Sequence, residues 1–297
     1  MSTSPAAERQ QKEWTIRALL EWTERHFQQK GLESPKLEAQ LLLAHALNCR
    51  RTELYVRWNE VVDEECRSRF RDLIRKRLEG CPVHYLLGRR EFFLLTLEVT
   101  PDVLIPRPET ELLVTEALRL LKPRAAPRVL DVGTGSGCIA LAIAQNHPTA
   151  IVTAVDISPE AVLVAQRNAQ RLRLDDRVRF LIGDLLEPVR GETFDLIASN
   201  PPYIAADEWS QIASSVRDFE PRIALDGGAD GFAVYDRLIP QAAESLTETG
   251  ILLLEIGYRQ ELGVQKRLEA AGMVCGPALR DDLRLPRVMV ARKSHRR

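Results

Sequence analysis

The side chains best placed to do chemistry are four consecutive residues that follow an apolar run. The run "FDLIAS" (194–199) leads directly into Asn200, Pro201, Pro202 and Tyr203. Asn200 supplies a side-chain oxygen and Pro201 a backbone carbonyl, and the fixed φ of the prolines would hold both acceptors in place. Two such acceptors can bind an NH2 group and aim its delocalised lone pair at an electrophile, while Tyr203 offers a flat face to a planar group. We therefore predict these four residues to be catalytic and substrate-binding. The alternative is that Pro-Pro only ends a strand, with the asparagine in a turn and the tyrosine in the packing.

A glycine-rich turn lies about 65 residues earlier, after the apolar stretch "RVLDV" (128–132). Glycine lets the backbone turn sharply and approach a ligand closely, because no Cβ intervenes. The spacing is G-x-G-x-G, not the G-x-G-x-x-G of dinucleotide-binding folds, which disfavours a nicotinamide dehydrogenase. By itself such a turn is weak evidence for a cofactor site, and its role could be purely structural. We predict cofactor contacts from its five residues: Gly133, Thr134, Gly135, Ser136 and Gly137.

Acidic residues follow the next two predicted strands. Asp156 ends "AIVTAVD" (150–156), the position that accepts ribose hydroxyls in nucleoside-binding α/β folds. It could instead cap the helix that starts at Ser158-Pro159, although Ser158 is the better cap. Asp184 and Leu185 follow "VRFLIG" (178–183), where groups bracket an adenine. With the glycine turn, these residues predict a site for S-adenosylmethionine.

These residues all follow predicted strands of one sheet. From residue 107 onward, short apolar strands alternate with helical stretches, which favours a mainly parallel sheet covered on both faces. Ligands bind such sheets beyond the carboxyl ends of the strands. We therefore predict the seven-stranded, Rossmann-like methyltransferase version of the α/β fold. The expected strands are 128–132, 150–156, 178–183, 194–199, 250–256 and 287–292.

The first part of the chain reads as helix after helix. A helix should end at Gly31, and a second should begin with Ser34 as cap and Pro35 at its first position. The apolar stretch from 90 to 105 is interrupted by Pro101, which suggests a hairpin of two short strands. The predicted division is a helical domain (1–86), a hairpin connector (87–106) and a methyltransferase domain (107–297). A basic run at 67–77 is most simply a solvated helix face, with contact to an acidic or RNA-bearing partner as the alternative.

Composition limits the class of protein. Forty-one Lys and Arg against 42 Asp and Glu give a formal net charge of −1 over 297 residues. That balance does not suggest a wide nucleic-acid-binding face, so we expect no direct nucleic-acid partner. Five scattered cysteines without CxxC spacing favour a reducing compartment and no metal site. No apolar stretch is long enough to span a membrane and no signal-peptide pattern is present, so the expected location is cytoplasmic.

Four longer stretches resemble a known family. They are "SPKLEAQLLLAHAL" (34–47), "VLIPRPETELLV" (103–114), "EPRIALDGGADGFAVY" (220–235) and "LEIG" (254–257). Together with Asn-Pro-Pro-Tyr they resemble the release factor glutamine methyltransferases (the PrmC/HemK family), over nearly the whole chain. The resemblance implies methylation of the glutamine N5 atom in the Gly-Gly-Gln motif of peptide chain release factors 1 and 2. It also implies S-adenosylmethionine as cofactor, direct methyl transfer, and a helical domain that docks the release factor. We expect a monomer.

The same resemblance suggests further cofactor-binding residues in "IPRPET", with Asn200 also reaching the cofactor. Arg107, Pro108 and Thr110 resemble the segment that closes over the methionyl group, although a proline and acidic residues at a helix start are ordinary N-terminal chemistry. The chain departs from the family pattern at four places, which include His84, where glutamine is common, and "DLRLPRVMV" (282–290), which lacks a glycine before its arginine. Leu94 stands where a glycine is common, and Leu185 where relatives can carry an aromatic against the adenine.

Three rival interpretations remain. Asn-Pro-Pro-Tyr is shared with adenine-N6 DNA methyltransferases, but such an enzyme should carry a basic, aromatic target-reading region. A methyltransferase for a ribosomal-protein glutamine is closer, and "IPRPETE" argues against it. A silent cofactor-binding scaffold would have no use for an intact Asn-Pro-Pro-Tyr.

Overall fold

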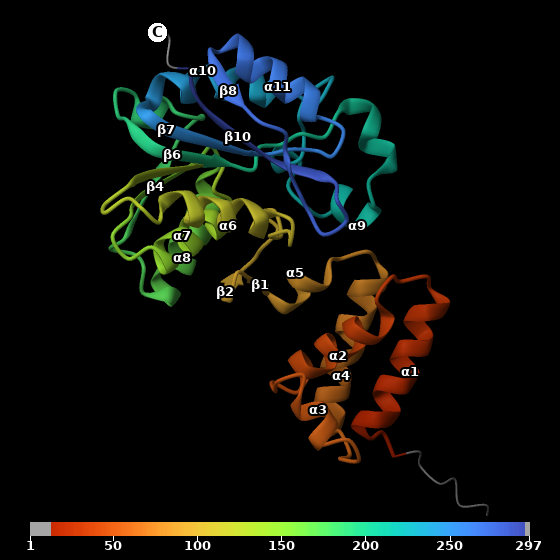
Figure 1. The fold of residues 1–297 in the computed structure, drawn as a ribbon. Helices are drawn as coiled ribbons and strands as arrows, with labels where there is room; N and C mark the ends of the chain where they lie inside the picture. Colours follow the sequence, from red (N-terminus) through yellow and green to blue (C-terminus); the bar gives the residue numbers. More distant parts are fainter. Residues whose placement is uncertain (1–12, 295–297) are drawn as a thin grey trace, which may run out of the picture. The chain divides into compact units, whose positions relative to one another are not determined.

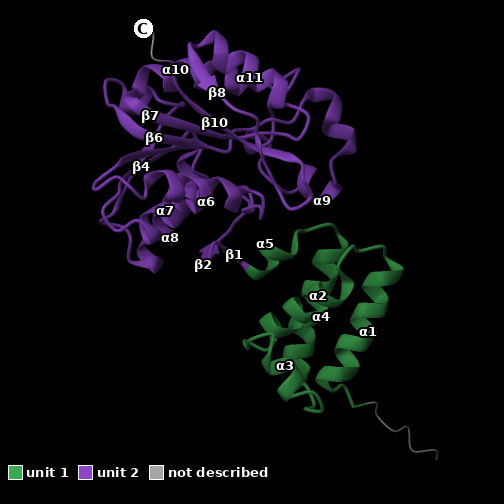
Figure 2. Ribbon diagram, in the orientation of Figure 1, with its two compact units in different colours: residues 1–87 green, residues 88–297 purple. Residues whose placement is uncertain are grey.

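The structure is a computed structural model, and it describes residues 13–294. The chain forms two compact units, residues 1–87 and 88–297 (Figure 2). Within the described residues, no helix is both long and apolar enough to cross a membrane. Each unit has a hydrophobic core of its own and is described separately below.

The first unit is a small helical bundle. Its helices are α1 (Ile16–Gln29), α2 (Pro35–Ala46), α3 (Glu53–Val56), α4 (Glu64–Leu78) and α5 (Val83–Leu87). The backbone turns after α1 at Gly31, where φ is 76°. Thr15 and Asp63 cap α1 and α4 through their side chains. Ser34 occupies the N-cap position of α2, but its side chain makes no capping hydrogen bond, so the predicted cap is wrong in that detail.

The basic run lies on α4, and its arginines are paired with carboxylates. Arg71 pairs with Glu64 at 2.7 Å and Arg69 with Glu65 at 3.3 Å along the exposed face of the helix. Arg77 reaches Glu38 of α2 at 2.6 Å, and both of these side chains are largely buried. Because carboxylates neutralise these arginines, the basic run is best interpreted as a solvated helix face, with one ion pair that links α4 to α2.

The second unit starts with the hairpin. Strands β1 (Arg89–Phe92) and β2 (Leu95–Glu98) pair in antiparallel register, with Phe92 opposite Leu95. The turn is Phe93-Leu94, and both residues have positive φ, 47° and 63°. The expectation that Pro101 separates the two strands is therefore wrong. A two-residue turn with positive φ at both positions matches the twist of the strands, and Pro101 follows the hairpin.

The sheet has the order β5-β4-β3-β6-β7-β10-β8, with β9 paired to β10. Pairs β3–β4, β4–β5, β3–β6 and β6–β7 are parallel, whereas β10 is antiparallel to its neighbours. The strands are β3 (Arg128–Val132), β4 (Ile151–Asp156), β5 (Val178–Ile182), β6 (Phe194–Ser199), β7 (Leu246–Glu255), β8 (Met273–Cys275), β9 (Leu279–Arg280) and β10 (Pro286–Lys293). The predicted seven-stranded, Rossmann-like methyltransferase fold is confirmed. Strands β8 and β9 were not predicted, because a strand of two or three residues is too short to show the alternation of apolar and polar residues.

Helices cover both faces of the sheet (Figure 1). One face carries α6 (Thr110–Leu121), α7 (Cys138–Asn146) and α8 (Pro159–Leu172), and the other α10 (Ala233–Ser245) and α11 (Glu261–Ala270). Short helices η1 (Glu187–Val189), η2 (Ala206–Gln211), α9 (Ser214–Arg217) and η3 (Arg222–Ala224) lie in the connections.

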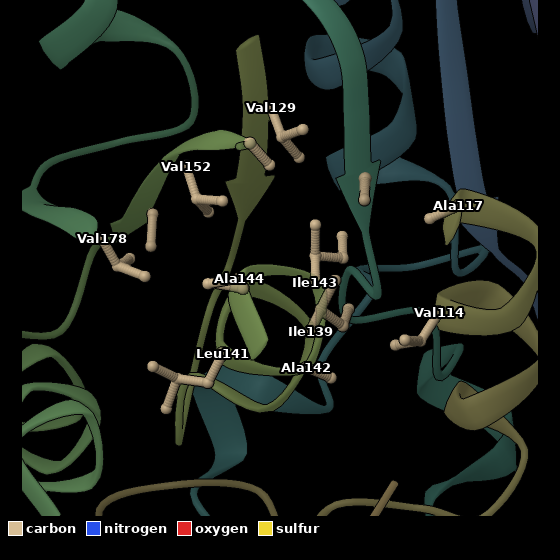
Figure 3. Packing of buried hydrophobic residues seen from close by; sticks show 14 of the residues in the cluster. Val114, Ala117, Val129, Ile139, Leu141, Ala142, Ile143, Ala144, Val152 and Val178 are labelled. Carbon is tan, nitrogen blue, oxygen red and sulfur yellow. The ribbon is translucent and has the colours of Figure 1, made fainter. Parts of the chain in front are cut away.

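Successive residues of the central strands enter different cores. Val129 of β3 packs with α6 and α7 (Figure 3), while Leu130 belongs to the core on the other face. The chain winds from β3 to β5 on one side, then returns to place β6 on the other side of β3. This switch point, at the carboxyl ends of the strands, is where such sheets bind ligands.

Candidate active site

A cavity of about 550 Å³ opens at this switch point. That volume lies within the range of pockets for small molecules and cofactors. Seven of the predicted site residues line it: Gly133, Gly135, Asp156, Asp184, Leu185, Asn200 and Pro202. They lie at or just after the carboxyl ends of four different strands, β3 to β6, so the fold brings together segments that are separated in the sequence.

The glycine turn presents backbone to the cavity. Gly133 and Gly135 have φ of 73° and 55°, and a Cβ on either would meet no heavy atom within 4 Å. The positive φ therefore requires glycine there, and the open space beside each one is the cavity itself. The Gly135 amide donates to Oδ2 of Asp156 at 2.8 Å, which joins the turn to the end of β4.

The other three residues of the turn are not among those that line the cavity, and their contacts hold the turn in shape. The Thr134 hydroxyl donates to Oδ2 of Asp131 at 2.7 Å, and the carbonyl of Ser136 accepts from the side-chain Nδ2 of Asn168 at 2.9 Å. A Cβ on Gly137 would lie 2.9 Å from Cδ1 of Leu141, so α7 packs too closely for a larger residue. None of the three is on the cavity wall, and their contact with a cofactor stays a prediction.

Asp131 is a part of this site that sequence reasoning did not single out. Its Oδ2 also accepts from the Ala140 amide at 3.1 Å, while its buried Oδ1 has no hydrogen-bond partner among residues 13–294. Burial raises the pKa of Asp131 to about 7, and the hydrogen bonds from Thr134 and Ala140 limit the rise. A carboxyl group at the buried end of a strand, just before a glycine turn, is the signal that could have identified it.

Asp156 combines two structural bonds with a place on the cavity wall. Its Oδ1 accepts from the Ser158 amide at 3.0 Å, and burial raises its pKa. The Ser158 hydroxyl accepts from the Ala161 amide at 3.1 Å, so Ser158 caps α8 as predicted. A carboxylate has about four acceptor positions. Asp156 can therefore hold the turn and still accept ribose hydroxyls.

Asp184 forms an ion pair with Arg237 of α10, which also lines the cavity. Arg237 was not predicted, since it is 53 residues away in the sequence. Leu185 has a φ of 51° and packs partly on the core behind the sheet, so this wall of the cavity is aliphatic. Nearby, Ile157 and Ile223 contribute further aliphatic side chains to the same cavity.

The backbone of Asn-Pro-Pro-Tyr is clamped by segments from two other loops. The Tyr203 carbonyl accepts from Nε2 of Gln260 at 3.0 Å, and Nε2 of Gln260 also donates to the Gly231 carbonyl at 3.0 Å. A Cβ on Gly227 would lie 2.7 Å from the Tyr203 carbonyl carbon, so the two backbones are in contact. Burial raises the pKa of Tyr203 to about 12, which keeps its phenol protonated. Pro201 is buried and Tyr203 half-buried, and of the four residues only Asn200 and Pro202 line the cavity.

The "IPRPET" segment lies beside the site, and its three predicted residues are not on the cavity wall. Arg107 pairs with Glu220 at 2.6 Å, and Glu220 also accepts from the Ile105 amide at 3.1 Å. Pro108 is exposed, whereas Thr110 is buried and bonds to Asn200. Segments close in sequence to the two partners of this ion pair do line the cavity. They are Asp102–Leu104, before Arg107, and Pro221–Ala224, directly after Glu220. Glu220 was not predicted, because its partner lies 113 residues away.

The cavity fits S-adenosylmethionine. Its glycine turn leaves backbone open to a ligand, a carboxylate stands at the ribose position, and aliphatic side chains surround the adenine position. A sheet of this strand order, with such a turn after the first parallel strand, is the architecture of S-adenosylmethionine-dependent methyltransferases, and the chain is an enzyme of that class.

Comparison with known proteins identifies the branch within that class. Residues 18–88 match the PrmC N-terminal domain and residues 109–216 the methyltransferase small domain. A release factor glutamine methyltransferase of Rhodopirellula baltica is 49% identical over 82% of this chain and 84% of the relative. One from Koribacter versatilis is 40% identical over 94% of this chain and 99% of the relative. The chain belongs to the release factor glutamine methyltransferase family.

Solved structures agree on the fold alone. The hMettl16 catalytic domain has a TM-score of 0.55 at 17% identity, covering 75% of this chain and 82% of that chain. The T. thermophilus 16S rRNA methyltransferase RsmC, solved with AdoMet and guanosine, has a TM-score of 0.51 at 21% identity, covering 69% of this chain and 50% of that chain.

Proposed function

We propose that this protein transfers the methyl group of S-adenosylmethionine to the N5 atom of the Gly-Gly-Gln glutamine in peptide chain release factors 1 and 2. The observation that carries the proposal is Asn200 on the wall of the cofactor cavity, in a protein of the release factor glutamine methyltransferase family. Its side-chain oxygen and the Pro201 carbonyl would accept the two hydrogens of the substrate NH2 group.

In the proposed reaction the amide nitrogen attacks the sulfonium methyl carbon in line. The carbon–nitrogen bond forms as the carbon–sulfur bond breaks, and sulfur keeps the electron pair as a neutral thioether. The nitrogen then loses one proton to solvent. No strong base is needed, because that proton becomes acidic once the methyl group has arrived. The residues of the chain act by orientation and electrostatics.

Several structural features support this mechanism. Gln260, Gly227 and Gly231 fix the backbone of the Asn-Pro-Pro-Tyr segment, so that its acceptors are placed before the substrate arrives. Because the pKa of Tyr203 is raised, its phenol is neutral and carries no negative charge that would draw the substrate NH2 group away from the two acceptors. Gly133, Gly135, Asp156, Asp184 and Leu185 are the residues that would hold the cofactor.

We also propose that the helical unit docks the release factor, and that the protein acts as a monomer without binding nucleic acid directly. The last of these proposals, that nucleic acid is not bound directly, is supported by α4. Its arginines are paired with carboxylates, which leaves little free positive charge on that helix for phosphates.

The test uses methyl-labelled S-adenosylmethionine with a purified release factor, and beside it the same factor with the loop glutamine changed to alanine. Plasmid DNA and ribosomes serve as parallel substrates. Label should enter only the glutamine-bearing factor. Label in DNA or ribosomes instead would contradict the proposed substrate.

A further inference from the structure

A buried carboxylate joins two segments that lead into the cavity wall. Glu220 follows α9, and its side chain is only 1% exposed. Its Oε1 accepts from Nη2 of Arg107 at 2.6 Å, and its Oε2 accepts from the amide of Ile105 at 3.1 Å. One side chain thus holds a segment from a distant part of the sequence at two points. We call Arg107, Glu220 and the Ile105 amide the clamp.

The clamp adjoins the cavity on both of its sides. Asp102–Leu104 line the cavity just before Ile105, and Pro221–Ala224 line it directly after Glu220. Arg107 and Glu220 themselves are not among the residues that line it. Because the Ile105 amide and Glu220 are each bonded in the chain to a wall residue, a shift of the clamp must move both parts of the wall.

The loop that begins at Glu220 is also tied to the Asn-Pro-Pro-Tyr segment. The amide of Ile204, directly after that motif, donates to the Leu225 carbonyl at 2.9 Å. The Ile204 carbonyl accepts from the Gly227 amide, also at 2.9 Å. The clamp therefore acts on a loop whose other end is held beside the proposed acceptors.

Burial makes the clamp more restrictive than a surface ion pair. Most surface pairs contribute little and exchange partners readily, because water solvates both charges. A carboxylate in the interior is strongly unfavourable unless it is paired and hydrogen-bonded. Glu220 meets both conditions only while Arg107 and the Ile105 amide are in place, so the two segments are held in one arrangement.

We propose that Arg107 and Glu220 are positioning residues that hold the two wall segments in the arrangement that binds S-adenosylmethionine. Arg107 then acts on the cofactor through Glu220 and not by contact. This role differs from the closure over the methionyl group that the family resemblance suggested for Arg107. It does not depend on which substrate receives the methyl group, because it concerns affinity for the cofactor.

The first experiment is a double-mutant cycle in the full-length protein. Arg107→Met removes the charge, Glu220→Gln keeps the shape without the charge, and a third variant carries both changes. The Kd for S-adenosylmethionine is measured by calorimetry without any methyl acceptor. Each single change should weaken binding by about tenfold, because a displaced wall loses contacts with the cofactor. The double variant should stay within about threefold of the weaker single variant, because both changes break the same pair.

A conservative variant tests whether the charge of Arg107 is what matters. Arg107→Lys keeps a cation and a donor for Glu220, although it loses the planar fork of the guanidinium. It should recover most of the affinity that Arg107→Met loses. If lysine binds the cofactor no better than methionine, the ion pair is not what holds the wall and the inference fails.

Arg124→Met is the matched control. Arg124 forms a similarly buried ion pair with Asp195, and the two side chains are 22% and 24% exposed. Asp195 lies at the amino end of β6, however, whereas the cavity lies at the carboxyl ends of the strands. The melting temperature of Arg124→Met should fall, and its Kd for S-adenosylmethionine should stay within about twofold of that of the unaltered protein.

Two results of the cycle would overturn the inference. If both single variants melt earlier but bind the cofactor like the control, the clamp serves stability alone. If the losses add, so that the double variant binds about 100-fold more weakly than the unaltered protein, Arg107 contacts the cofactor independently of Glu220.

Loss of folding in Arg107→Met would not leave the question open. That variant leaves a buried carboxylate unpaired, whereas Glu220→Gln leaves only the partly exposed Arg107 without its partner and the double variant leaves no charge. These two proteins should have the same Kd within about threefold, and both should bind more weakly than the unaltered protein. A further loss in the double variant would again assign Arg107 to direct contact.

Failure of the clamp is distinguishable from failure of the proposed function. If the Kd values follow the expected pattern and no release factor is labelled, only the substrate assignment fails. If a release factor is labelled and all the clamp variants bind the cofactor normally, only the positioning role of Arg107 and Glu220 fails.

Discussion

Asn200 contributes to the proposed reaction through one atom, the oxygen of its side chain. Replacing it with alanine removes that acceptor and leaves the residues at the ribose and adenine positions unchanged. We expect Asn200→Ala to lower turnover by roughly two orders of magnitude or more, as for loss of one oxyanion-type contact. Cofactor binding should be largely kept. Single-turnover labelling of a release factor and calorimetry with S-adenosylmethionine measure the two quantities, and near-normal turnover would remove the acceptor argument.

Asp131 should make the stability of the fold depend on pH. Burial raises its pKa from 3.8 to about 7, so between these values the folded protein binds more protons than the unfolded chain. Stability must then fall as pH rises through this window, by roughly 1.4 kcal/mol for each unit by which the pKa is raised. Asp131→Asn removes this ionisation and can still accept from Thr134 and Ala140. We expect its melting temperature to improve relative to the unaltered protein between pH 4.5 and 8.

The comparison must be made as a difference between two curves. Glu255 is buried with a raised pKa and adds a slope of the same sign in both proteins. Parallel melting curves for the unaltered protein and Asp131→Asn over this range would show that Asp131 does not titrate between the two states.

At the scale of elements, the hairpin turn carries an avoidable backbone cost. Leu94 has a φ of 63°, and its side chain is completely exposed, so the left-handed conformation gains no burial in return. Such a conformation costs an ordinary residue roughly 1–2 kcal/mol and glycine almost nothing. Leu94→Gly should stabilise the protein by about 0.5–1 kcal/mol after the greater flexibility of unfolded glycine is subtracted. Urea unfolding checks this, with Leu262→Gly, another exposed leucine but within α11, as a destabilising control.

The loop at 225–231 supports Asn-Pro-Pro-Tyr by backbone contact. A Cβ at Gly227 would lie 2.7 and 2.8 Å from backbone atoms of Tyr203, which cannot move aside as a flexible side chain could. We expect Gly227→Ala to displace this segment and to lower kcat by about tenfold or more, because a displacement of about 1 Å misplaces both acceptors. Gly276→Ala is the matched control, since its Cβ would enter open space. Equal activity of the two variants would mean that the contact does not position the segment.

At the scale of the whole molecule, each unit buries its own core. Phe27 is fully buried in the helical unit, whereas Val56 in the same unit is 87% exposed. Phe27→Ala should destabilise the helical unit by about 3–5 kcal/mol, and Val56→Ala should have almost no effect. If the units fold independently and the helical unit docks the release factor, Phe27→Ala should raise KM for the factor while the Kd for S-adenosylmethionine stays the same. Loss of cofactor binding in Phe27→Ala would show that the units are not independent.

Much of this protein could be predicted from local sequence. The glycine turn, Ser158-Pro159 at the start of α8, and Pro-Pro after β6 each act on the backbone within a few residues, so their effect is visible in the sequence itself. Strands β3 to β6 were predicted nearly to the residue because each is a short apolar run that ends in a turn. The family resemblance then supplied the substrate, which no local pattern contains.

Tertiary structure alone decided which side chains stand behind these motifs. Gln260 reaches Tyr203 across 57 residues, Asn200 reaches Thr110 across 90, and Glu220 reaches the Ile105 amide across 115. Such bonds leave no periodic trace in the sequence, because each depends on where separate strands and helices come together in space. For the same reason the hairpin turns at Phe93-Leu94 and not at Pro101, since the pairing of β1 with β2 selects the turn. Local residues thus specified the chemistry of the site, and packing specified what holds it in place.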